Sequence, residues 1–414
     1  MNMRITCLSV SDQLGGSEVA LLGMVSALER LHPEWQFQIV LPGEGPLRAR
    51  LNETRAICSV VPMPAALSQL GEWSAVQDGW RTGSQVALGI KLCGTAAVLP
   101  AYESRLRRVI AEFQPHVIHT NGLKAHVLGA RLRTRQAGLV WHLHEYIARR
   151  KLTRWLLRRY APRCSAIVAN STSVARDIES SIGPKPDVHV VPNAVDLDVF
   201  APTGTRLDLD RLAGLPPASA AVTRVGLIAT YAKWKGHEVF LDAIKQIASR
   251  KSIRGYIIGG PIYDTPNSQF TRRDLQTLIE SRQLDGCVGL TGFVEAAPAM
   301  RALDIVVHAS TEPEPFGLVI AEAMACGRPV VTTGDGGAAE MIAHGHDALV
   351  AAAGEAAVLA EAIGELAANP ALRAAIGERA RETARARFAP PTVASQLGRV
   401  FEAISSRSPV AQPA

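Results

Sequence analysis

Two carboxylates lie at the start of a predicted helix in the segment Glu312–Val331, which reads EPEPFGLVIAEAMACGRPVV. The pattern predicts that the helix opens at Phe316 and ends at Gly327, a residue type typical of a helix C-terminus. Glu314 then lies at the mouth of the helix and Glu322 in its second turn. The free N–H groups of the first turn favour an anion, and the carboxylates accept hydrogen bonds from hydroxyls. A sugar nucleotide carries both groups and suits this chemistry.

Two glycine-containing loops are further candidates for binding a ligand. Lys235 and Gly236 lie between a predicted strand and a predicted helix, where a lysine can contact phosphate. Gly15 and Gly16 follow the first predicted strand, and we expect Ser17 to cap the helix that comes next. A glycine pair at this place allows a ligand to approach the backbone, although it is also compatible with an ordinary tight turn.

Histidines gather at the ends of two predicted strands. His142 and His144 share one face of a strand, and His116 and His119 lie on a neighbouring segment, so a zinc site is conceivable. The only acidic residue at metal spacing is Glu145, which points to the opposite face, and no cysteine is placed to help. We therefore predict no metal site.

The order of the elements predicts an α/β protein with two doubly wound, Rossmann-like domains. Strand–helix–strand units recur along both halves of the chain, as in parallel sheets. The segment Pro192–Pro202 has no long periodic pattern and is the candidate hinge. We expect an N-terminal domain at 1–195, a C-terminal domain at 196–388, and a last segment, 389–414, whose helix packs back on the N-terminal domain and whose end is disordered. Ligands bind outside the carboxyl ends of such strands, so the two halves are expected to face a central cleft.

The apolar runs and periodic patterns predict the following strands and helices. Strands are expected at 4–10, 37–41, 56–61, 116–119, 139–143, 166–170, 225–229, 256–260, 289–293, 305–309 and 329–333. Helices are expected at 17–30, 102–113, 153–160, 237–249 and 269–282, with Ala-rich helices closing the chain. Residues 68–100 mix glycine, tryptophan and small apolar side chains and indicate a helix or two.

The composition favours a cytoplasmic protein. Six scattered cysteines, without a C-x-x-C pair, indicate reduced thiols, and the start of the chain lacks a signal-peptide core. Residues 1–200 contain 23 basic and 16 acidic residues, against 21 and 22 in the rest of the chain. The segment Arg149–Arg163 contributes seven basic residues and no acidic one, so it is either a solvated helix face or a helix lying on an anionic membrane. No nucleic-acid motif is visible, and we expect no nucleic-acid partner.

Six motifs in order resemble the retaining, sugar-nucleotide-dependent glycosyltransferases of the GT-B fold, group-1 or GT4-like type. The pair Glu314 and Glu322 resembles their E-x7-E motif, and the other matches cover nearly the whole chain. They are Gly15-Gly16-Ser17-Glu18, Pro192-Asn193-Ala194-Val195-Asp196, Lys235-Gly236, Cys326-Gly327-Arg328-Pro329 and Gly336-Gly337-Ala338-Ala339-Glu340.

The resemblance implies a donor nucleotide held by the C-terminal half and an acceptor held by the N-terminal half. Glu314 would bind donor-sugar hydroxyls, Glu322 the ribose hydroxyls and Lys235 the diphosphate, while His144 would lie beside the transferred sugar. The remaining donor-binding candidates are Phe316, Gly317, Leu318, Lys233 and Thr230. No cofactor or divalent ion is implied beyond the nucleoside-diphosphate sugar itself.

One departure from the family concerns the donor phosphate. Many relatives have an arginine five residues before the lysine, where this chain has Thr230, and Lys233 is the candidate replacement. His308-Ala309 also stands where relatives often show Pro-Ser. The sequence thus predicts transfer of a sugar to a hydroxyl acceptor, either a growing polysaccharide or a lipid-linked glycan. A catalytically silent sugar-nucleotide-binding protein, a same-fold epimerase and a phosphorylase remain the alternatives.

Overall fold

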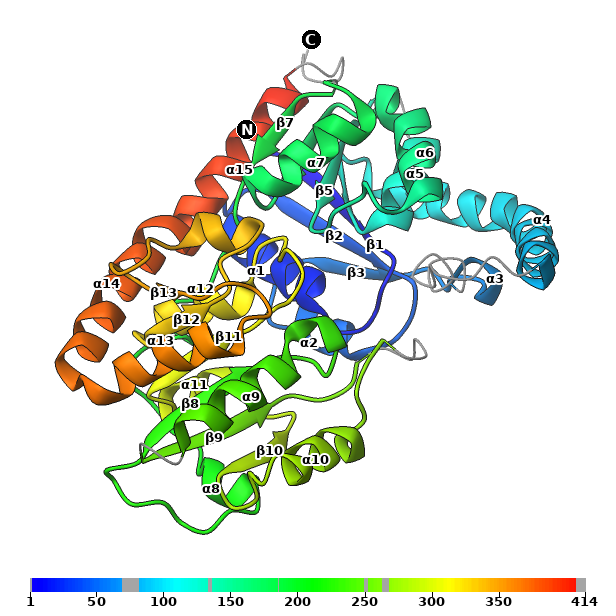
Figure 1. Cartoon of the computed structure of the whole chain (residues 1–414). Helices are drawn as coiled ribbons and strands as arrows, with labels where there is room; N and C mark the ends of the chain where they lie inside the picture. Colours follow the sequence, from blue (N-terminus) through cyan, green and yellow to red (C-terminus); the bar gives the residue numbers. More distant parts are fainter. Residues whose placement is uncertain are drawn as a thin grey trace. The chain divides into compact units, whose positions relative to one another are not determined.

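The computed structural model describes residues 2–68, 82–132, 136–184, 186–248, 252–262 and 268–406, with the backbone alone for 82–96. The chain divides into two α/β units (Figure 1). Unit 1 comprises the residues up to Ala194 together with those from Pro390 onward, and unit 2 is Val195–Ala389. No helix in the described ranges is long and apolar enough to cross a membrane.

Unit 1 contains a sheet of parallel strands in the order β3-β2-β1-β4-β5-β6-β7. The strands are β1 (Arg4–Ser9), β2 (Gln36–Leu41), β3 (Ile57–Val60), β4 (Val117–Asn121), β5 (Gly138–Leu143), β6 (Ala166–Ala169) and β7 (Val188–Val190). The helices are α1 (Gly16–Leu31), α2 (Pro46–Leu51), α3 (Ala65–Ser68), α4 (Thr82–Phe113), α5 (Leu123–Leu132), α6 (Lys151–Tyr160), α7 (Thr172–Ile182) and α15 (Pro390–Ser405).

Apolar residues cover both faces of this sheet, as its near-continuous hydrophobic strands require. One cluster joins the sheet to α1, α2 and α15, where Phe401 and Leu397 pack with Val25 and Leu28. The other joins the opposite face to α4, α5, α6 and α7. The last helix of the chain therefore belongs to the core of unit 1 and packs against α1.

Unit 2 has a second parallel sheet, with strand order β10-β9-β8-β11-β12-β13. Its strands are β8 (Thr223–Ile228), β9 (Ile253–Ile258), β10 (Val288–Gly292), β11 (Ile305–His308), β12 (Val330–Thr332) and β13 (Leu349–Val350). Its helices are α8 (Leu209–Leu212), α9 (His237–Ala248), α10 (Arg272–Ser281), α11 (Ala296–Ala302), α12 (Leu318–Ala325), α13 (Ala356–Ala368) and α14 (Pro370–Phe388). The helices α9, α10 and α13 bury one face of the sheet, and α8, α11, α12 and α14 bury the other.

The predicted strands agree with the structure to within a few residues at each end, while two short edge strands, β7 and β13, were not predicted. The helix predicted at 102–113 is the last part of α4, which continues through Pro100. Part of the ambiguous region 68–100, namely 69–81, lies outside the described residues. The predicted disordered tail begins at Ser405, which is a buried residue of α15, and residues 407–414 lie outside the described ranges.

The prediction that Ser17 caps the first helix is wrong. The helix α1 already begins at Gly16, and its N-cap is Gly15, which has extended backbone and no side chain to offer. Ser17 instead lies in the first turn and donates a hydrogen bond from Oγ to Oε1 of Glu18 at 3.0 Å. The Ser17 hydroxyl therefore binds a carboxylate and does not cap the backbone N–H groups of the helix.

Candidate active site

The order of strands in unit 2 reverses between β8 and β11. Chains leaving two neighbouring strands at such a point turn in opposite directions, which opens a crevice at their carboxyl ends. The loop after β8 contains Lys235, and the loop after β11 contains Glu314. Val307 of β11 pairs with Leu227 of β8, so both loops leave the sheet side by side.

Glu314 is the centre of a buried polar cluster at this edge of the sheet. Its Oε2 accepts a hydrogen bond from Lys235 Nζ at 2.6 Å and one from Ser310 Oγ at 3.1 Å, and lies 3.1 Å from His308 Nε2. Burial opposes ionisation of this carboxyl, yet the charge of Lys235 and the hydrogen bond with His308 together lower the pKa of Glu314 to about 2. Glu314 is therefore an ionised hydrogen-bond acceptor at neutral pH.

His308 is a member of this cluster that was not predicted as a site residue. Its Nδ1 lies 3.0 Å from Thr332 Oγ1 on the neighbouring strand β12, so both ring nitrogens have polar partners. Thr333 extends the network by donating from Oγ1 to the Ser310 carbonyl at 2.8 Å. The sequence feature that could have identified His308 is its place as a polar residue at the end of an apolar strand. Such residues lie at the edge where parallel sheets bind ligands.

Gly236 allows the Lys235 loop to approach the β11 strand end. It has φ of 75°, and a Cβ there would lie 1.8 Å from the Ala309 carbonyl oxygen. The loop is fixed further by Thr311, whose N–H donates to the Trp234 carbonyl at 2.8 Å. Lys235 Nζ also lies 3.9 Å from the centroid of the Trp234 ring, a cation–π distance.

The helix α12 begins immediately beyond this cluster. Its N-cap is Gly317, with φ of 86°, and Leu318 is its first residue. The Phe316 ring does not face a ligand site: it is buried and packs edge-on against Phe388 at a centroid distance of 5.7 Å. Phe316 and Gly317 are therefore candidates to contact a ligand through their backbone groups alone.

Glu322, one turn into α12, is another buried carboxyl of unit 2. Its side chain is buried, and this burial raises its pKa to about 8. Without a ligand, Glu322 is therefore largely protonated at neutral pH. The two glutamates differ in ionisation because the charge of Lys235 offsets the burial of Glu314, whereas burial alone determines the pKa shift of Glu322.

A third glycine-rich loop contacts the backbone of Glu314. The N–H of Gly337 donates to the Glu314 carbonyl at 2.7 Å, and Gly336 pairs with Glu314 in an isolated parallel bridge. This loop follows β12, so three neighbouring strand ends of unit 2 contribute to one site.

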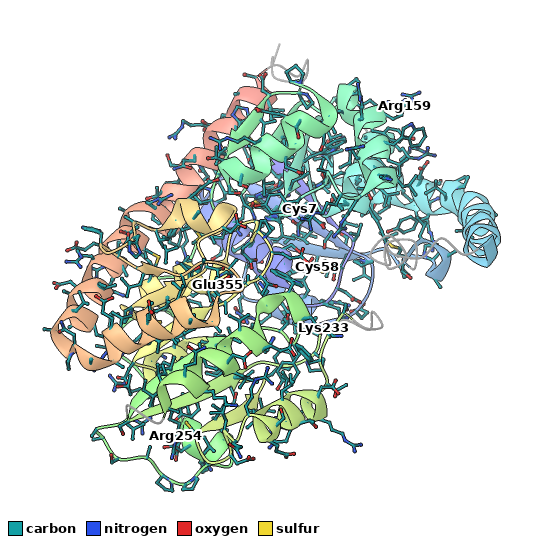
Figure 2. All side chains as sticks on the ribbon, viewed as in Figure 1. Cys7, Cys58, Arg159, Lys233, Arg254 and Glu355 are labelled. Atoms are coloured by element: carbon teal, nitrogen blue, oxygen red, sulfur yellow. The ribbon has the colours of Figure 1, made fainter. Side chains whose placement is uncertain are left out.

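The two other donor-binding candidates, Lys233 and Thr230, also belong to the segment after β8. Lys233 Nζ is 5.7 Å from the centroid of the Phe270 ring, and its charge contributes to lowering the pKa of Asp274. Lys233, labelled in Figure 2, thus faces the segment that enters α10. Thr230 lies half-buried in the loop after β8.

In unit 1 the strand order reverses between β1 and β4, and the candidate residues lie at the matching end of its sheet. A Cβ at Gly16 would meet open space, whereas one at Gly15 would lie 2.8 Å from Oε2 of Glu18. Asn121, at the end of β4, donates from its side chain to the Ser17 carbonyl at 3.1 Å. Asn121 was not predicted, although it also ends an apolar strand.

His144 follows β5, and its ring lies beside that of His142 at a centroid distance of 4.1 Å with the two planes tilted by 35°. The two histidines were predicted to share one face of this strand. His142 Nδ1 in turn lies 3.1 Å from His119 Nε2, while His116 accepts from the Arg4 backbone N–H. Burial lowers the pKa of His144 to about 4. Both ring nitrogens of His144 are buried and have no hydrogen-bond partner within the described part of the chain. A neutral imidazole with free nitrogens can either donate to or accept from a ligand.

Within the described ranges, no three histidine, cysteine or acidic side chains are grouped so as to hold a metal ion. Glu145, the acidic residue nearest to the histidines in the sequence, forms an ion pair with Arg150 at 2.6 Å.

Two family models match the two units separately. The model "Glycosyltransferase Family 4" matches residues 14–199, and the model "Glycosyl transferases group 1" matches residues 222–369. The chain belongs to the group-1, family-4 glycosyltransferases. Both parallel sheets lie within the matched ranges apart from the first strand, so the family assignment concerns both units.

Solved structures of other proteins have the same fold. HepE from Anabaena, solved in complex with UDP, matches with a TM-score of 0.77 and 24% identity over 97% of this chain and 100% of that one. Sucrose-phosphate synthase from Thermosynechococcus elongatus matches with a TM-score of 0.75 and 19% identity over 98% and 100%. These likenesses show the GT-B fold, with its two parallel-sheet α/β domains.

Curated relatives match over different lengths. A D-inositol 3-phosphate glycosyltransferase of Pseudarthrobacter chlorophenolicus is 33% identical over 52% of this chain and 50% of its own length. The lipopolysaccharide core biosynthesis mannosyltransferase LpcC of Rhizobium leguminosarum bv. viciae is 26% identical over 77% and 90%. The chain thus spans about half the length of the first of these glycosyltransferases.

Proposed function

We propose that this glycosyltransferase moves a sugar from a nucleoside diphosphate to a hydroxyl of an acceptor, with retention of anomeric configuration. The observation that carries the proposal is the Lys235–Glu314 pair beside the N-terminus of α12. The pair provides a cation for a diphosphate and an ionised carboxylate for sugar hydroxyls in one crevice. HepE, which shares the fold, binds UDP and UDP-glucose, and this supports a nucleotide-sugar donor.

Catalysis in this proposal comes from electrostatic stabilisation of the departing diphosphate. Negative charge builds on the leaving group while the sugar gains oxocarbenium character, so preorganised positive potential is the largest help that the protein can give. The Lys235 ammonium has three donors, of which Glu314 takes one, and the remaining donors suit phosphate oxygens. The N-terminus of α12 adds backbone N–H groups to the same charge pattern.

The acceptor hydroxyl attacks on the face from which the diphosphate leaves, with the sugar held as a tight ion pair. We assign Glu314 no role as a covalent nucleophile, because its ionised carboxylate is bound to Lys235 and Ser310. His144, with two free ring nitrogens in the unit we assign to the acceptor, is the group we place beside the transferred sugar. Glu322 would bind the ribose hydroxyls of the donor. The acceptor class we propose is a polysaccharide or a lipid-linked glycan.

A panel of UDP-, GDP- and ADP-sugars tests the proposal, with thermal shift for binding and nucleotide release for transfer. Release with one donor in the presence of an acceptor mixture supports the transferase. A thermal shift without release under any mixture would favour a catalytically silent nucleotide-binding protein. The observation that favours this alternative is Thr230, which stands where many relatives have an arginine. No shift with any nucleotide would refute the donor site.

A further inference from the structure

We propose that the outer face of α6 docks unit 1 onto an anionic lipid bilayer. Leu157 is the only fully buried residue of this helix, which packs against α5 and α7 through that side. The opposite side is exposed, so α6 presents a complete face outward from unit 1.

Two large apolar side chains lie on that exposed face. Leu152 is 50% exposed and Trp155 is 62% exposed. With Arg159 they occupy positions i, i+3 and i+7, which fall on one side of an α-helix. An exposed tryptophan beside an exposed leucine is costly in water, but a tryptophan is favoured at the level of lipid headgroups.

Cations flank the apolar pair. Lys151, Arg158 and Arg159 are exposed and form no ion pair with any described residue, and Arg159 projects from the end of α6 in Figure 2. Other basic residues of the segment Arg149–Arg163 bind groups within unit 1. Arg150 pairs with Glu145, and Arg163 donates to the Ala130 carbonyl. A fourth exposed cation of α6, Arg154, donates to the Ala148 carbonyl at 3.4 Å, and the other three, Lys151, Arg158 and Arg159, are left for an external anion.

The combination of charge and apolar area identifies the partner. Between Arg149 and Arg163 the chain has seven basic residues and no acidic one, so the surface repels cations and attracts anions. A short amphipathic helix with tryptophan and leucine between arginines binds in the plane of an anionic interface, with its apolar side chains inserted and its cations at the phosphates. A lipid surface binds the cations through its phosphates and at the same time removes the apolar side chains from water. A soluble anion would leave Leu152 and Trp155 in water.

One consequence depends on the proposed function. The helix begins seven residues after His144, so docking through α6 would bring the acceptor-binding unit to the surface where a lipid-linked acceptor lies. The docking itself needs no transfer activity and is measured by vesicle binding alone. Failure of docking therefore leaves the donor chemistry unaffected, and failure of transfer leaves the docking unaffected.

Flotation of the full-length protein with vesicles tests the docking. Vesicles of phosphatidylcholine mixed with phosphatidylglycerol should carry the protein upward, and vesicles of phosphatidylcholine alone should not. Replacing Lys151, Arg158 and Arg159 by Gln should lower the partition coefficient about a hundredfold, because each cation near an anionic surface contributes roughly a factor of five. The control variant replaces three exposed arginines of unit 1 by Gln, namely Arg30, Arg108 and Arg399, and should float as the wild type does.

Tryptophan fluorescence separates insertion from simple charge attraction. Vesicles should shift the emission of the wild type to the blue, and Trp155→Phe should bind vesicles but lose most of that shift. Leu152→Ser with Trp155→Ser should weaken binding while leaving the melting temperature unchanged, because both side chains are exposed. Equal flotation of the charge variant and the wild type, or equal binding to both kinds of vesicle, would overturn the proposal, as would an absence of flotation with either.

Discussion

Lys235 Nζ lies 2.6 Å from Glu314 Oε2, although the two residues are 79 positions apart in the sequence. The pair joins the ends of β8 and β11 at the point where the strand order reverses. Both side chains are mostly buried, with 19% and 11% exposed. Removing one partner of such a pair leaves the other charge uncompensated in a poorly solvated place.

A double-mutant cycle measures this pairing. Lys235→Met should lower the free energy of unfolding by about 3 kcal/mol, because Glu314 stays buried without its cation. Glu314→Gln in the same chain should recover most of that loss, since no unpaired charge then remains. Additive effects of the two changes would show that the charges do not interact.

The positions of Lys235 and Glu314 just after two strands could be predicted from sequence, because both residues lie in short motifs next to well-patterned strands. The contact between them could not be, since it depends on which strands are neighbours in the sheet. His308 was missed for a similar reason, because its partner Thr332 lies on β12 and is brought beside it only by the pairing of β11 with β12. The Ser17 cap failed because Gly15 could take the extended N-cap position without a side-chain hydrogen bond.

The His308 ring is expected to position Glu314. Truncation in His308→Ala removes a hydrogen bond to a buried carboxylate, and such bonds contribute about 1.5–3 kcal/mol. We expect kcat to fall about tenfold or more, with a smaller change in KM for the donor. His308→Gln keeps a donor and should recover part of kcat. The exposed His346→Ala in the same unit serves as the control, and equal kinetics for the two alanine variants would contradict the positioning role.

Gly236 and Gly286 form a matched pair, because both have φ of 75°. An alanine costs about 1–2 kcal/mol at either position for the left-handed backbone. At Gly236 the new Cβ would also collide with the Ala309 carbonyl, while at Gly286 nothing lies within 4 Å. Gly236→Ala should therefore destabilise the protein by a further ~1–3 kcal/mol and reduce donor binding. Similar denaturation curves for the two variants would rule out the close approach.

Glu322 should make stability fall as pH rises. Its pKa is raised in the folded protein from 4.5 to about 8, so the folded state holds a proton that the unfolded state releases. Between those two values the free energy of unfolding should decrease with a slope approaching about 1.4 kcal/mol per pH unit from this group. Glu322→Gln should remove that contribution and be more stable than the wild type near pH 8.

Denaturation of the ligand-free protein at several pH values provides the measurement for Glu322. The exposed Glu361→Gln on α13 is the control and should keep the wild-type pH dependence. If Glu322→Gln and the wild type lost stability in parallel between the two pKa values of 4.5 and about 8, the carboxyl would not be protonated in the folded state.

The most direct test of the donor site is transfer by Glu314→Ala, measured beside nucleoside-diphosphate binding. The variant should still bind the nucleotide, because Lys235 and the N-terminus of α12 remain, while sugar transfer should fall below detection. Glu361→Ala should transfer at the wild-type rate. Near-normal transfer by Glu314→Ala would contradict the role given to this carboxylate and with it the account of the site.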